Sequence, residues 1–273
     1  VTPEDSKGIS GDYSKVRKTR FITNQQRHNM FEELPSYDDP LAKHYGYRRS
    51  AHKGPIKHGE VFSFYQANLE RRYGEKERGS YLTQWRDTTV DRMVDWGFTS
   101  MGNWVDPVFY QNKRIPYFAN GWIIGDFKTV SSGFDYWGAM PDPFDPEFVK
   151  RALKTAKVIS EEVLNSPWCI GGFIDKEMSW GGKGAPIQQY GIVLDAFSRN
   201  ANESPTKSAF VNYLKNKYQT IEKLNQSWDQ HLSSWSAFAA GVNYKEATHF
   251  SDKMLRDMSS LLTLYADEYF KVV

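Results

Sequence analysis

The stretch at residues 168–181, W-C-I-G-G-F-I-D-K-E-M-S-W-G, constrains the fold of this chain more than any other. Its apolar first half changes abruptly to the charged residues Asp175, Lys176 and Glu177. An apolar run bounded by proline and glycine is typical of a strand buried on both faces. A parallel strand that ends in a carboxylate presents it at the mouth of an α/β barrel, where catalytic groups lie. A structural acid paired with a nearby arginine fits the pattern equally well.

The rest of the chain combines helical and strand patterns around this stretch. Residues 1–58 are polar and irregular, with short helical turns between the prolines of 27–42. We expect helices over 59–74, 80–96 and 146–165, strands over 98–104 and 114–124, and further helices over 205–218, 220–228 and 251–273. Two apolar stripes predict buried helix faces, one including Leu153 on 146–165 and one on 251–273 that needs a sheet to cover it. This order of elements is typical of a parallel α/β fold.

Glu177 is the leading candidate for a general acid. To act near neutral pH it must keep its proton, which partial burial beside Trp180 would favour. The Lys176 ammonium would oppose this if it turned toward the carboxylate, but alternate residues of a strand face opposite ways. Trp180 also offers an aromatic surface beside the acid, which suits the apolar C–H face of a sugar ring.

Polar and aromatic residues end the other two expected strands as well. Asn103 and Asn120 could read sugar hydroxyls, although asparagine at a strand end is more often a turn former. Four tryptophans are candidate stacking platforms: Trp104, Trp122, Trp137 and Trp180. Any one of them alone is better explained by packing, but four near strand ends indicate a groove.

Composition excludes several other functions. A net charge of +2 with interspersed signs does not favour nucleic acid, and no apolar stretch is long enough to span a membrane. The single cysteine, Cys169, excludes an internal disulfide, and the six histidines lack metal-binding spacing. Nucleotide-binding glycine motifs are absent, so we expect neither metal nor cofactor. The aromatic content of 15% favours a carbohydrate or peptide groove.

Several motifs together resemble one known family. F-I-D-K-E-M-S-W-G is similar to the acid/base strand of the agarases in glycoside hydrolase family 50, clan A. The resemblance extends to the sequences at 28–46, 58–74, 95–104 and 213–228 and therefore covers nearly the whole chain. The motif at 213–228 is also shared with the family 42 β-galactosidases and is less specific.

The resemblance implies a (β/α)₈ TIM barrel, of which residues 1–273 supply an N-terminal to middle portion. Residues 1–58 would precede βα units at 59–273 that reach about the fourth strand and the following helices. The resemblance also implies a bacterial enzyme that is secreted or periplasmic. This enzyme would cleave the β-1,4-galactosidic linkages of agarose or neoagaro-oligosaccharides with retention of configuration and release neoagarobiose. Glu177 matches the acid/base, and the expected substrate contacts are Asn103, Trp104, Asn120, Trp122, Asp175, Lys176 and Trp180. The oligomeric state is left open.

This sequence departs from the family pattern at two points. Lys176 stands where the family usually has an asparagine that, in clan A, binds the 2-hydroxyl of the sugar. A retaining enzyme also needs a second carboxylate about 5 to 5.5 Å from the first, and we expect it on a later strand than residues 1–273 supply. A degenerate carbohydrate-binding protein and another clan A β-galactosidase therefore remain as alternatives.

Overall fold

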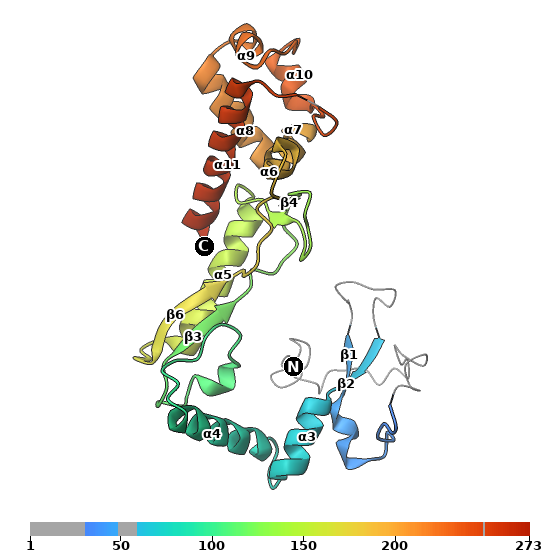
Figure 1. Cartoon of the computed structure of the whole chain (residues 1–273), viewed down its shortest axis with the longest axis vertical. Coiled ribbons are helices and arrows are strands. Elements are labelled where there is room, and N and C mark those ends of the chain that lie inside the picture. Colours follow the sequence, from blue (N-terminus) through green and yellow to red (C-terminus); the bar gives the residue numbers. More distant parts are fainter. Residues whose placement is uncertain (1–30, 49–58, 248) are drawn as a thin grey trace. The chain divides into compact units, whose positions relative to one another are not determined.

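The computed structural model describes residues 31–48, 59–247 and 249–273 (Figure 1). These residues form two compact units. The first holds the described residues up to Asn120 together with Glu162–Gly172, and the second holds Gly121–Glu161 and Phe173–Val273.

The first unit begins with a short hairpin. A 3-10 helix, η2 (Pro40–His44), leads into β1 (Tyr45–Arg48), which pairs antiparallel with β2 (Gly59–Phe62). The prediction of one helix over 59–74 was therefore wrong in its first part. The Ser63 hydroxyl accepts a hydrogen bond from the backbone N–H of Gln66, so this N-cap starts α3 only at Phe64, and α3 ends at Tyr73. The predicted helix at 80–96 is confirmed as α4 (Ser80–Asp95).

The two predicted strands after α4 differ in extent. Between 98 and 104 only an isolated parallel bridge forms, from Met101 to Tyr117, and η3 (Pro107–Phe109) follows it. The second strand is β3 (Tyr117–Gly121), which pairs with β6 (Cys169–Ile174). Hydrogen bonds from Tyr117 N–H to Trp168 O and from Asp175 N–H to Gly121 O advance together along both strands, so β3 and β6 run parallel.

Strand β6 lies where the sequence predicts it, but it is not buried on both faces. The side chains of Ile170 and Phe173 are 52% and 39% exposed. In the described part of the chain β6 pairs with β3 alone, so these apolar side chains lack the covering layer that a doubly buried strand has.

The second unit begins with a small hairpin followed by a long helix. The hairpin joins β4 (Thr129–Val130) to β5 (Met140–Pro141). Helix α5 (Pro146–Val163) begins as predicted, with the Asp145 carboxylate accepting the Glu147 N–H. Its predicted buried face is only partly confirmed, because Phe148 is buried whereas Leu153 is 67% exposed.

A cluster of helices completes the second unit (Figure 1). Their bounds are α6 (Pro186–Gln189), α7 (Gly191–Ser198), α8 (Pro205–Tyr218), α9 (Ile221–Trp228), α10 (Trp235–Ala240) and α11 (Asp252–Val272). Side chains of Ser204, Thr220 and Ser251 cap α8, α9 and α11, which confirms the predicted starts of these helices.

The apolar stripe of α11 is covered mainly by helices, and the sheet that the sequence predicted is replaced by a few strand residues near Tyr265 and Tyr269, such as Pro141 of β5 and Ile174 of β6. Its buried side chains join the core around α7, and α11 also contacts α8 and α9. The cause lies in α7, whose sequence G-I-V-L-D-A-F-S is buried almost throughout and so occupies the centre of the cluster. Buried Asp257 of α11 further ties these helices together by accepting hydrogen bonds from Lys217, Tyr218 and Trp228.

Candidate functional site

The turn after β6 carries the candidate acid in an unusual backbone conformation. Asp175 and Glu177 have φ angles of +47° and +65°, in the left-handed region. Aspartate is enriched there, but glutamate rarely adopts it, and such strain persists only where the surroundings impose it. Residues held in this way are concentrated at functional sites.

Asp175 anchors this turn from inside the protein. Its Oδ1 accepts a hydrogen bond of 2.7 Å from the Ile123 N–H, just beyond β3, and its Oδ2 accepts one of 3.3 Å from the Tyr269 hydroxyl on α11. The residue is buried, and burial raises the pKa of its carboxyl group against the opposing effect of these two donors. The carboxylate predicted to contact substrate is therefore engaged by its own chain.

Glu177 itself points away from the packed interior. Its side chain is 47% exposed, so the partial burial expected beside Trp180 is not seen among the described residues. The Lys176 Nζ lies 3.4 Å from the Glu177 Oε1, which shows that the lysine turns toward the carboxylate. The left-handed turn explains this arrangement, because the alternation of side chains along a strand ends with β6 at Ile174.

The second unit also contains three of the four predicted aromatic platforms, one of which, Trp137, is 55% exposed between β4 and β5. Trp180 is half-buried, with its ring stacked at 5.6 Å on Phe270 and edge-on to Tyr265 and Tyr269. Packing against α11 therefore occupies one side of this ring. Trp122 is 40% exposed, and its carbonyl oxygen accepts a hydrogen bond from Thr155 of α5.

The first unit contains the remaining predicted contacts. The Asn120 side chain accepts the Trp104 N–H at 3.0 Å and donates to the Val105 carbonyl at 3.1 Å, so it shapes the loop after residue 103. Trp104 is 41% exposed at a φ of +72°. The Asn103 Nδ2 is buried and has no hydrogen-bond partner among the described residues, which leaves a donor available to a water or a ligand.

The structure thus assembles the predicted residues in two groups, each within its own unit. One group comprises Asn103, Trp104 and Asn120, and the other comprises Trp122, Asp175, Lys176, Glu177 and Trp180.

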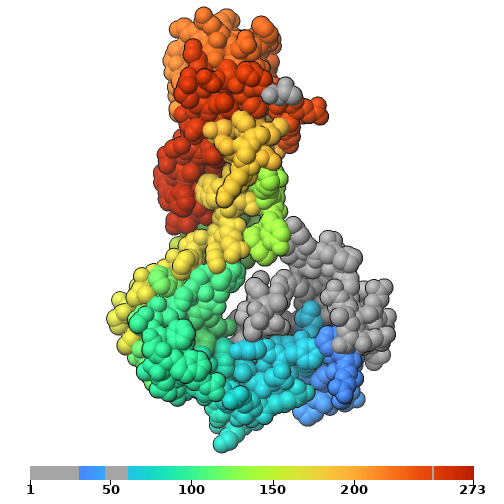
Figure 2. All heavy atoms as spheres, viewed as in Figure 1, coloured from blue at the N-terminus to red at the C-terminus, as the bar shows by residue number. Residues whose placement is uncertain are grey.

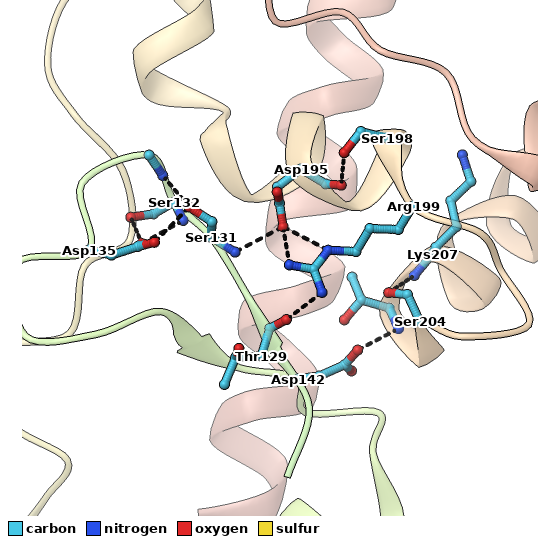
Figure 3. A network of polar contacts seen from close by, with 12 residues as sticks. Thr129, Ser131, Ser132, Asp135, Asp142, Asp195, Ser198, Arg199, Ser204 and Lys207 are labelled. Carbon is cyan, nitrogen blue, oxygen red and sulfur yellow. Dashed lines mark hydrogen bonds and ion pairs between the residues drawn. The ribbon is translucent and has the colours of Figure 1, made fainter.

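A polar network in the second unit was missed by the sequence analysis (Figure 3). Buried Asp195 of α7 accepts hydrogen bonds from the Ser131 N–H and the Arg199 guanidinium, and Arg199 also donates to the Thr129 carbonyl. This network fastens the β4–β5 hairpin to α7. The only local signal for it is the charge of Asp195 inside an otherwise apolar helix.

Two other site classes find no support in the described residues. Within 31–48, 59–247 and 249–273, no cluster of at least three His, Cys, Asp or Glu is placed to hold a metal ion. None of the helices described is both long and apolar enough to cross a membrane.

No protein-family profile matches the chain. Two curated relatives do, both from Vibrio sp. (strain JT0107). β-Agarase B is 44% identical over 94% of this chain, and β-agarase A is 36% identical over 90% of it. Among solved structures, an exo-β-agarase superposes with a TM-score of 0.87 at 58% identity, and the agarase AgWH50C with 0.80 at 51%. These two matches cover 91% and 90% of this chain.

The chain is homologous to these β-agarases. This confirms the resemblance to family 50, to which the name of a further solved neighbour, PfGH50B, also points. The chain spans 27% and 24% of the curated β-agarases and 33% to 35% of the solved ones. The homology supports the mixed helix-and-strand fold, but the described residues do not form a closed barrel.

Proposed function

We propose that the protein hydrolyses the β-1,4-galactosidic linkages of agarose, with Glu177 as the general acid and base. The observation that carries the proposal is the half-exposed carboxylate in a strained turn at the end of a parallel strand, in a chain homologous to β-agarases. In (β/α)₈ barrels the active site lies at the carboxyl ends of the strands, so a general acid at such a strand end can reach a bound sugar.

The full proposal includes a (β/α)₈ barrel that residues 1–273 build in part, with βα units at 59–273. Glu177 protonates the glycosidic oxygen while a second carboxylate attacks the anomeric carbon, and the leaving sugar departs. Glu177 then takes a proton from the water that hydrolyses the covalent intermediate, so configuration is retained. In this proposal the second carboxylate lies outside residues 1–273. Neoagarobiose is the product, released from the chain end, and the enzyme acts outside the cytoplasm on its polymeric substrate.

The residues predicted as substrate contacts take different roles in this proposal. Asn103 contributes its unpaired Nδ2 donor, and Trp104 and Trp122 contribute half-exposed rings. Asn120 shapes the loop that carries Trp104, and Asp175 holds the turn that carries Glu177. Trp180 contacts sugar only with the part of its ring that packing against α11 leaves open.

The test is the variant Glu177→Gln in the complete protein. Loss of a general acid costs roughly 100- to 10,000-fold in rate, so kcat on agarose should fall by that range while oligosaccharide binding persists. A 2,4-dinitrophenyl β-galactoside needs no protonation of its leaving group, so its cleavage step should suffer much less. Glu246→Gln, at an exposed residue in the same unit, is the matched control. An unchanged agarose rate in Glu177→Gln would rule out Glu177 as the acid.

A second candidate is a degenerate carbohydrate-binding protein, which the Lys176–Glu177 ion pair favours. In this ion pair the carboxylate is engaged by the neighbouring residue of its own chain and not by a leaving group. Agarose binding without hydrolysis in the wild-type protein, with hydrolysis appearing in Lys176→Asn, would support this candidate over the first.

A further inference from the structure

The segment between β4 and β5 exposes three aromatic side chains. Phe134, Tyr136 and Trp137 are 44%, 53% and 55% exposed. The rings of Tyr136 and Trp137 stand edge-on to each other with their centroids 4.8 Å apart. We call these three residues the 134–137 aromatic patch. Large aromatic side chains are normally buried for most of their area, so three together on one short segment indicate a binding surface.

The patch rests on a rigid support. The Asp135 carboxylate accepts hydrogen bonds from the Ser131 hydroxyl and from the N–H and hydroxyl of Ser132. The Ser131 N–H is in turn bound by Asp195 (Figure 3). Behind it the backbone packs so closely that a Cβ on Gly191 would lie 1.9 Å from the Ser132 carbonyl oxygen. The rings are therefore presented by a fixed loop, which lowers the entropic cost of binding.

The patch is also continuous with the loop that follows Glu177. A Cβ placed on Gly182 would come within 2.3 Å of the Phe134 ring, so the 131–138 segment lies directly against the start of the 181–185 loop. In Figure 2 the yellow-green and yellow parts of this unit adjoin each other on the face in view. A polymer bound at Glu177 thus has an aromatic surface within the same unit.

The chemistry of the patch selects a neutral ligand. Asp135 is the single charge between 131 and 138, and both of its oxygens are engaged inside the loop. The exposed surface of the three residues is largely aromatic ring, which matches the apolar C–H face of a galactose residue. Segment 131–138 supplies no cation for an anionic, sulfated galactan, and the one cation of the adjoining 181–185 loop, the exposed Lys183, lies outside the three residues of the patch.

We propose that the 134–137 aromatic patch is a further galactan subsite, beside the loop that follows Glu177, with Trp137 as the principal stacking residue for an uncharged galactose unit. This subsite rests on the proposed function, because it binds another unit of the same polymer. A remote contact of this kind is made equally in the ground state and the transition state, so it affects KM and leaves kcat nearly unchanged.

The test uses the complete protein in the Glu177→Gln background, so that oligosaccharides bind without being cleaved. Calorimetry should show Trp137→Ala binding neoagarohexaose about ten-fold more weakly, while Trp137→Phe keeps most of the affinity. Neoagarobiose, too short to reach both places, should be unaffected. Trp96→Ala removes another exposed tryptophan, on the C-cap of α4, and should leave hexaose binding unchanged. In the active background Trp137→Ala should raise KM for long substrates.

Two results would overturn the subsite, and they are distinguishable. If Trp137→Ala binds neoagarohexaose as tightly as its parent while Glu177→Gln has abolished hydrolysis, the subsite is wrong and the proposed function stands. If the wild-type protein neither binds nor cleaves any neoagaro-oligosaccharide, the proposed function is wrong and the subsite falls with it. Thermal unfolding of each variant confirms that a loss of affinity is local.

Discussion

At the scale of single residues, Asp175 decides how Glu177 is held. Both of its oxygens are hydrogen-bonded within the protein, one to the N–H of Ile123 and one to the Tyr269 hydroxyl. Burial raises the pKa of Tyr269 as well, so its hydroxyl stays protonated and remains a donor. We therefore assign Asp175 a positioning role, through the backbone turn that it shares with Glu177.

Asp175→Ala tests this role. The substitution leaves the buried Ile123 N–H without an acceptor, which lowers the free energy of unfolding by about 1 to 3 kcal/mol and frees the turn to change conformation. We expect kcat on agarose to fall at least ten-fold with little change in KM, together with a lower melting temperature. Asp175→Asn keeps the acceptor for Ile123 and should restore most of the rate. Tyr269→Phe, which removes one weaker bond, should have a smaller effect. Equal kcat in Asp175→Ala and wild type would contradict the assignment.

At the scale of secondary-structure elements, α8 contains a charge in the core of the helical cluster. Lys207 is fully buried, and its Nζ donates to the Phe197 carbonyl and lies 3.8 Å from the centre of the Phe238 ring. Burial lowers the pKa of Lys207 to about 7, although the ring and the carbonyl favour the ammonium form. In the unfolded chain the lysine keeps its ordinary value of 10.5.

This difference makes stability depend on pH. Between about pH 7 and 10.5 the unfolded chain binds more protons at Lys207 than the folded protein does, so the free energy of unfolding rises with pH, by up to ~1.4 kcal/mol per pH unit. Below pH 7 both states are protonated, and this contribution becomes flat. Lys207→Met should remove the slope and stabilise the protein at pH 7, whereas Lys215→Met, exposed on the same helix, should retain the slope. Denaturant unfolding between pH 6.5 and 9 measures the free energy of unfolding of both variants and its dependence on pH. An unaltered slope in Lys207→Met would refute the prediction.

At the scale of the whole molecule, several apolar side chains of residues 1–273 are left in contact with solvent. Ile170 and Phe173 on β6, Leu153 on α5 and Phe270 on α11 are all more than a third exposed. The homologous agarases are three to four times as long as the part that matches this chain. In an enzyme of that length, further strands and helices would cover such surface.

Residues 1–273 produced alone should accordingly associate. We expect a strong fluorescence increase with a hydrophobic dye, concentration-dependent light scattering and no release of neoagarobiose from agarose, because the uncovered strand β6 offers an edge and an apolar face for association. The complete protein, measured in parallel, should show none of the dye binding. A cooperatively unfolding monomer of residues 1–273 that cleaves agarose would contradict this expectation and the placement of the second carboxylate elsewhere.

Local patterns in the sequence were enough to place most helices and the central strand. The capping residues Ser204, Thr220 and Ser251 start helices as predicted, because an N-cap acts within a few residues of backbone. The same holds for Asp145 ahead of α5 and for the apolar run that becomes β6. Local reasoning failed at 59–62, where pairing with β1, a contact distant in sequence, made a strand out of an expected helix.

By itself, the sequence determined the candidates for chemistry, which are Asp175 and Glu177 after one strand and asparagines and tryptophans near two others, and a family resemblance that homology confirmed. Only the tertiary structure decided what each of them faces. It buried Asp175 under Tyr269, turned Lys176 toward Glu177, packed Trp180 on α11 and left Trp137 exposed. The reason is physical: residue type and spacing fix local backbone preferences, whereas burial and pairing depend on neighbours brought together from distant parts of the chain.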